Sequence, residues 1–122
     1  MALLDTNMIL RYLLDDNQEM ADVVEEYLDA RNASVTTEVI AEVVYVLKGV
    51  YSMERNLISS VVNDFLKLVS CRESDVLNIA LDTYANHNLD FVDCVLYGYH
   101  VAKGATIATF DKKLQKLLRI RQ

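Results

Sequence analysis

Acidic residues stand where short apolar segments give way to helical patterns. Asp5 follows the apolar residues 2–4, and Asp111 comes two residues after a second apolar segment that ends at Thr109. The carboxyl ends of parallel strands line the crevice where open α/β sheets bind ligands, so two carboxylates from opposite ends of the chain can meet there. The alternative for each acid is helix capping, because Asp is favoured at the N-cap and in the first turn.

Three further acids fall within helical patterns. Glu42 lies at the border of an apolar helical stripe, where a carboxylate needs a partner, a cation or access to water. Its alternative role is that of a half-exposed surface residue. Asp90 and Asp93 form an Asp-x-x-Asp at a helix start, which has the shape of a capping box. Capping explains Asp90 better than Asp93, because the box prefers Glu or Gln at its second position.

A cation is the expected companion of these acids. Carboxylates gathered in one cleft repel one another and raise one another's pKa unless a cation compensates them. An all-oxygen ligand set suits Mg²⁺ or Mn²⁺. The sequence has no zinc-type His/Cys set, no Walker A motif and no arrangement typical of a Ser or Cys nucleophile. A metal ion held by the carboxylates is therefore the chemistry that these residues indicate.

The charge is distributed unevenly along the chain. Its 12 Lys and Arg against 18 Asp and Glu give a net charge of −6, which argues against broad electrostatic capture of nucleic acid. Residues 112–122, in contrast, contain several basic residues and no acid. Lys112 and Lys113 directly follow Asp111, where they could position a nucleic-acid backbone beside the metal. The alternative is that they belong to a solvated helix face.

Length and hydropathy indicate one α/β domain. The 122 residues leave room for a single domain over 1–122, and 52% hydrophobic with 25% charged residues is typical of a globular protein. Short apolar segments at 2–4, 33–35, 69–71 and 106–109 alternate with helical patterns, among them 37–51, 52–66 and 90–103. We expect Thr6 or Asn7 to cap a helix that runs to Leu14 and Thr37 to cap 37–51, and Gly104 suits the position after 90–103. This order predicts a mostly parallel sheet of four or five strands with helices on both faces. No apolar run is long enough for a membrane span and no signal peptide is evident, so we expect a cytoplasmic protein.

The motifs occur in an order that resembles PIN-domain ribonucleases, most closely the VapC-type toxins of toxin–antitoxin pairs. The matching segments are Leu-Leu-Asp-Thr-Asn at 3–7, residues 37–47, Asp-Phe-Val-Asp-Cys at 90–94 and Ala-Thr-Phe-Asp-Lys-Lys at 108–113. The resemblance implies a PIN-like fold and an endoribonuclease that depends on Mg²⁺ or Mn²⁺. Its metal-binding acids then fall on Asp5, Glu42, Asp93 and Asp111, with Thr6, Asn7, Thr109 and Asp90 as supporting residues. It also implies a homodimer and a cognate antitoxin protein that blocks the groove.

Two other functions compete with this interpretation. One is a PIN-like binding domain that has lost its activity, which four intact acids argue against. The other is a phosphoacceptor receiver domain, which is also α/β and acidic. A receiver domain needs paired acids after its first strand, whereas Asp5 stands alone there.

Overall fold

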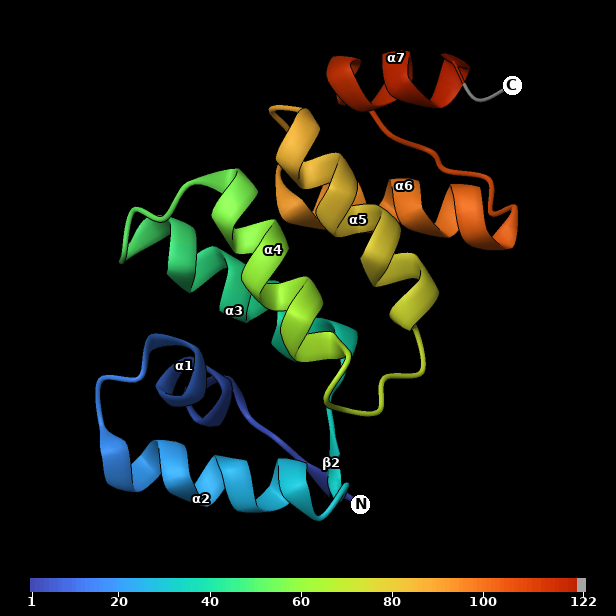
Figure 1. Ribbon diagram of the computed structural model, residues 1–122. Coiled ribbons are helices and arrows are strands. Elements are labelled where there is room, and N and C mark those ends of the chain that lie inside the picture. Colours follow the sequence, from blue (N-terminus) through green and yellow to red (C-terminus); the bar gives the residue numbers. More distant parts are fainter. Residues whose placement is uncertain (121–122) are drawn as a thin grey trace.

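A computed structural model describes residues 1–120 of the chain. Its elements, drawn in Figure 1, are in chain order β1 (Ala2–Leu3), α1 (Thr6–Leu14), α2 (Gln18–Asp29), β2 (Ala33–Ser34), α3 (Thr37–Gly49), α4 (Arg55–Leu66), α5 (Ser74–Asn86), α6 (Phe91–Lys103) and α7 (Lys112–Ile120). The described residues are therefore mostly helical, with a short parallel sheet.

Side-chain caps set where several helices begin. The sequence predicts Thr6 or Asn7 as the cap of α1, but Asp5 takes that position and its Oδ1 accepts the Met8 N–H at 2.9 Å. Likewise Thr36, not the predicted Thr37, caps α3. Both corrections move the cap one residue earlier, to the last residue with extended backbone, where a side-chain oxygen reaches the free N–H groups of the first turn.

The start of α4 also differs from the prediction. Ser52 has a φ of 52°, in the left-handed region, which cannot continue into a right-handed helix. The helix therefore begins at Arg55 rather than at Ser52. At the end of α6 the prediction is confirmed, since Gly104 ends that helix in the left-handed conformation with φ 69°.

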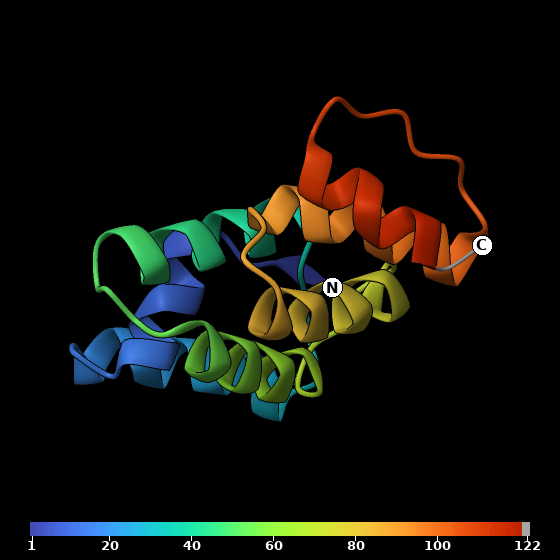
Figure 2. The same cartoon turned by 90° about the horizontal axis from the view of Figure 1, so that it is seen from above.

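The sheet is smaller than predicted. β1 and β2 pair in parallel, with Ala2 opposite Ala33, and a single parallel bridge joins Ser34 to Ser70. Two strands thus form within residues 1–120 instead of the predicted four or five, and 106–109 does not become a strand. After Gly104 this segment instead runs back along α6 and leads into α7, arching away from the helices as Figure 2 shows.

Burial of α7 explains where that segment goes. Leu114, Leu117 and Leu118 are buried on one face of α7, which packs on α6. Their burial holds the far end of the segment over α6 and away from β1. The Thr109 backbone carbonyl accepts a hydrogen bond from Nε2 of Gln115, a residue of α7, at 2.7 Å. This carbonyl, which a strand would pair with its neighbour in a sheet, therefore has a side-chain partner instead.

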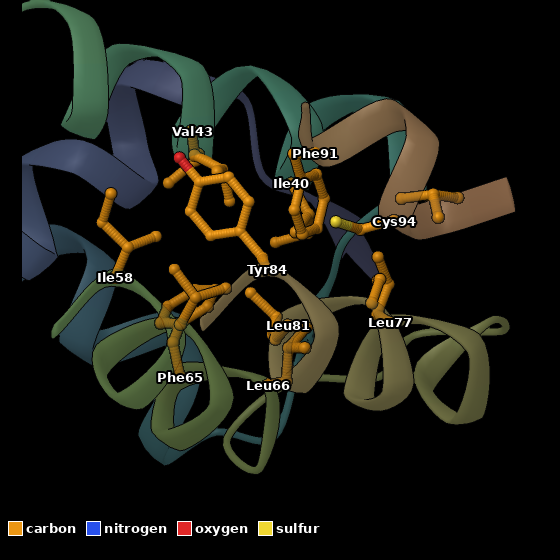
Figure 3. Close-up of a cluster of buried hydrophobic side chains, with 14 of the residues drawn as sticks. Ile40, Val43, Ile58, Phe65, Leu66, Leu77, Leu81, Tyr84, Phe91 and Cys94 are labelled. Carbon is orange, nitrogen blue, oxygen red and sulfur yellow. The ribbon is translucent and has the colours of Figure 1, made fainter. Parts of the chain in front are cut away.

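The main core lies among α3, α4, α5 and α6. Figure 3 shows this cluster, in which Ile40, Ile58, Phe65, Leu77 and Leu81 are fully or almost fully buried. The rings of Tyr84 and Phe91 meet edge to face with centroids 5.6 Å apart, which ties the end of α5 to the start of α6. No helix within residues 1–120 is long and apolar enough to cross a membrane.

Gly98 allows α5 and α6 to approach closely. A Cβ at this position would lie 2.5 Å from the backbone oxygen of Val76, which has no room to move aside. We expect Gly98→Ala to lower the free energy of unfolding by about 1–3 kcal/mol through overpacking. Gly49→Ala is the matched control, because nothing lies within 4 Å of the place its methyl group would take and alanine favours helix. Urea denaturation of both variants checks this, and equal stability of the two would contradict the close contact.

Candidate active site

The start of α6 presents two acids of the predicted site. Asp90 is the N-cap residue, with extended backbone, yet its side chain makes no capping hydrogen bond. Asp93 lies in the first turn of the same helix and is half-buried. The predicted capping box therefore does not form, and neither carboxylate accepts a hydrogen bond from the free N–H groups at the start of α6.

The start of α7 holds a third acid, Asp111, in a fixed orientation. Its Oδ1 accepts the Leu114 N–H at 2.8 Å, so Asp111 caps the helix. Its own N–H donates to Oγ1 of Thr109 at 3.0 Å. The capping role of Asp111 is thus real, but it occupies one carboxylate oxygen, and Oδ2 accepts no hydrogen bond from the residues that the structure describes.

These three residues, Asp90, Asp93 and Asp111, form what we call the α6–α7 acidic cluster. Burial raises the pKa of Asp93, and the negative charges of Asp111 and then Asp90 raise it further. Within residues 1–120 no Lys, Arg or His forms an ion pair with any of the three. The cluster therefore concentrates negative charge that the described side chains leave uncompensated.

Asp5 and Glu42 are not among the charges that raise the pKa of Asp93. Asp5 is exposed at the end of β1 and Glu42 is exposed on α3, which packs against both α1 and α6. Among the described residues no three Asp, Glu, His or Cys side chains come close enough together to hold a metal ion. Residues 106–109 do not pair with β1, so the strand-end crevice predicted to bring Asp111 to Asp5 does not form. Thr6 and Asn7 lie beside Asp5, half-buried and exposed, respectively.

Comparison with known proteins decides the family. The PIN-domain family model matches residues 2–119, almost the whole chain. The chain belongs to the PIN-domain family. A search of curated proteins and a search of solved structures both find no match. PIN domains are generally nucleases, so the family assigns a nuclease-type, hydrolytic function to this chain.

The donor chemistry of the PIN domain suits a divalent cation. PIN-domain nucleases typically use divalent metals. In the α6–α7 acidic cluster the donors are all carboxylate oxygens, the ligand type that Mg²⁺ and Mn²⁺ prefer. A cation there would offset the repulsion that raises the pKa of Asp93. Asp93 and Asp111 therefore suit a cation by charge and donor type, but among the described residues no third Asp, Glu, His or Cys lies close enough to complete a metal site with them.

A surface depression of the PIN domain lies elsewhere. It has a volume of about 830 Å³ and is bordered by the β1–β2 edge and the first turns of α3 and α5. None of the four predicted metal-binding acids lines it. This depression and the predicted metal-binding acids therefore lie at different places on the surface.

The two lysines after Asp111 have different surroundings. Lys112 is exposed, and its side chain makes no hydrogen bond to the described residues. Lys113 Nζ instead donates to the backbone oxygen of Asn88 at 3.3 Å, which ties α7 to the loop before α6. Of the two, Lys112 is the lysine free to reach a phosphate.

Sequence reasoning missed one residue beside the site, Arg55. Its Nη1 donates to the carbonyl oxygens of Tyr84, His87 and Leu89, at 3.1, 2.9 and 2.8 Å. The guanidinium also lies 4.1 Å from the centroid of the Tyr84 ring. Backbone carbonyls are present at every position of the chain, so no residue pattern could have indicated these partners.

Proposed function

We propose that this PIN domain is an endoribonuclease that depends on Mg²⁺ or Mn²⁺. The observation that carries the proposal is the α6–α7 acidic cluster, in which burial and the charges of Asp111 and Asp90 raise the pKa of Asp93 and no basic side chain of residues 1–120 pairs with them. Such uncompensated carboxylates favour a cation. Burial of Asp93 strengthens the effect, because charges interact more strongly away from water.

Each acid has a stated role in this proposal. Asp93 and Asp111 would hold the metal, and Asp5 and Glu42 complete the set by their positions in the family's motifs. The bound ion would lower the pKa of a water and offset the charge of the scissile phosphate. Thr109 and the first turn of α7 restrict the rotation of Asp111, so one carboxylate oxygen stays available for binding.

Metal removal tests the proposal. We expect the purified protein to cleave single-stranded RNA in millimolar Mg²⁺ or Mn²⁺, to lose cleavage in excess EDTA, and to regain it when either metal is restored. Cleavage undiminished in excess EDTA would overturn the metal dependence, and absence of cleavage in every metal would favour the inactive binding-domain alternative.

Lys112 supplies a phosphate contact in this proposal. It is exposed next to Asp111, and the positive end of the α7 dipole lies beside it. We expect Lys112→Ala to weaken RNA binding and to reduce the slope of log K against log salt by about 0.7, the value for one phosphate contact on a single strand. Lys48→Ala, an exposed lysine on α3, is the control. Equal slopes for both variants would make Lys112 a surface lysine only.

The toxin role and the partners rest on the motif resemblance. We propose that the domain is the toxin of a toxin–antitoxin pair, that it forms a homodimer, and that a cognate antitoxin protein blocks its groove. Analytical ultracentrifugation at tens of micromolar should give a mass of twice 13.9 kDa. A monomer under these conditions would count against the dimer. The receiver-domain alternative is not pursued, because the chain belongs to the PIN family.

A further inference from the structure

Arg55 is the first residue of α4, and it binds the loop that joins α5 to α6. Besides its three bonds to backbone carbonyls, its Nη2 donates to the Asn88 side-chain oxygen at 3.4 Å. Tyr84 lies in the last turn of α5, whose carbonyls have no partner within the helix. A cation at this end also interacts favourably with the helix dipole. The side chain thus satisfies backbone groups that the loop conformation leaves free.

The loop at 87–89 is held from two sides. Arg55 binds it from α4, and Lys113 Nζ binds the Asn88 carbonyl from α7. The next residue, Asp90, is the N-cap of α6, and Asp93 follows within the first turn. The loop therefore links the start of α6 to the start of α7, the two helix ends that carry the α6–α7 acidic cluster.

The aromatic residues behind the loop strengthen this link. The Arg55 guanidinium rests on the Tyr84 ring, and the Tyr84 ring packs edge to face on Phe91, the first residue of α6. Figure 3 shows Tyr84 and Phe91 next to each other within the core cluster. Arg55 is consequently linked to the start of α6 by two routes, through the loop carbonyls and through the edge-to-face pair of rings.

We propose that Arg55 is a positioning residue for the metal site. By fixing the 87–89 loop it sets where Asp93 lies relative to Asp111, and thereby the affinity for a divalent cation. This inference rests on the proposed function, because it concerns the cation of that same site. A lysine cannot replace Arg55 fully, since an ammonium has neither the second nitrogen that reaches the Asn88 side chain nor the planar guanidinium that lies over the Tyr84 ring.

Binding of Mn²⁺ to three variants tests the inference, with isothermal titration calorimetry as the readout. Groups that hold metal ligands in place typically contribute about 10–100-fold to metal affinity. We expect Arg55→Met to weaken Mn²⁺ binding by at least about tenfold, and Arg55→Lys to bind with intermediate affinity. Leu66→Ala is the control, because it removes a buried side chain at the far end of α4 without touching the loop. It should bind Mn²⁺ as the wild type does.

Amide hydrogen exchange separates positioning from general destabilisation. Arg55→Met should accelerate exchange chiefly at residues 88–94, whereas Leu66→Ala should accelerate it broadly through the core helices. Wild-type Mn²⁺ affinity in both Arg55 variants, or the same loss in Leu66→Ala, would overturn the inference. If the wild type itself binds no Mn²⁺, the proposed function fails, and so does the role of Arg55 in affinity. If Arg55→Met does not fold, the same two measurements on Arg55→Lys decide.

Discussion

Asp93→Asn is expected to reduce RNA cleavage by about a thousandfold or more while the protein stays folded. Metal-assisted charge stabilisation contributes several kcal/mol to a transition state, and about 4 kcal/mol corresponds to a thousandfold in rate. The amide has the same shape as the carboxylate but no charge. In the protein without metal, the charge of Asp93 is disfavoured by burial and by repulsion from Asp111 and Asp90. Removing this charge therefore does not destabilise the fold. Initial cleavage rates at saturating Mn²⁺ measure the loss, with circular dichroism as the check on folding.

Two further Asn variants separate catalysis from helix capping. Asp5 and Asp111 both cap helices, and Asn caps a helix about as well as Asp does. If capping is their whole role, Asp5→Asn and Asp111→Asn keep both stability and cleavage. If they hold the metal, cleavage falls and stability is retained. Asp82→Asn, an exposed acid on α5, is the control and should cleave normally. Undiminished cleavage by Asp93→Asn would contradict the proposed role of the cluster.

Divalent metal is expected to stabilise the fold through the same acids. A ligand that binds only the native state adds about 2.7 kcal/mol at a hundredfold excess over its Kd. For a domain of this size that corresponds to a rise in Tm of roughly 10 °C. Millimolar Mn²⁺ should produce this rise in the wild type and scarcely any in Asp93→Asn. Equal rises in both, seen by differential scanning fluorimetry, would mean that the ion binds elsewhere.

Mn²⁺ is expected to make the wild type more stable than Asp93→Asn. Without metal, the raised pKa of Asp93 predicts the reverse order of stability for these two proteins. A carboxyl whose pKa is higher in the folded state than in the unfolded chain binds protons more readily when folded, so its contribution to stability falls as pH rises. The loss begins near the ordinary Asp pKa of about 4 and is complete above the raised pKa. In EDTA at neutral pH, Asp93→Asn should therefore be at least as stable as the wild type. Urea denaturation at several pH values should show the difference disappearing below about pH 4.

Several parts of the fold were accessible from the sequence because local chemistry decides them. The apolar stripe of α3 and the left-handed Gly104 after α6 depend on residue type and spacing alone. The sheet was not accessible in the same way. Residues 106–109 have strand-like composition, yet the burial of Leu114 and Leu117 on α7 decides where the segment lies. Whether 106–109 joins the sheet or follows α7 depends on packing between segments far apart in the chain. A short window of sequence does not report such packing.

The candidate site likewise contains residues that local sequence identifies and a residue that only the folded structure identifies. Asp93 and Asp111 were identifiable because carboxylates at helix starts are visible as residue types, and the structure shows that they interact electrostatically. Arg55 was not identifiable. Its partners are main-chain carbonyls about thirty residues further along the chain, and its place at the start of α4 depends on the left-handed Ser52. Residue types alone carry no signal for such contacts.

Paramagnetic broadening by Mn²⁺ tests most directly whether a divalent cation binds at the four predicted metal-binding acids, Asp5, Glu42, Asp93 and Asp111. In ¹⁵N-labelled protein, substoichiometric Mn²⁺ broadens the amide signals nearest the ion. We predict that the first and strongest losses occur at residues 90–94 and 109–113, followed by those around Asp5 and Glu42. The acidic residues between Asp15 and Asp29 are the built-in competitor, since they carry carboxylates on an exposed surface. Broadening that begins at 15–29 and spares 90–94 would contradict the account.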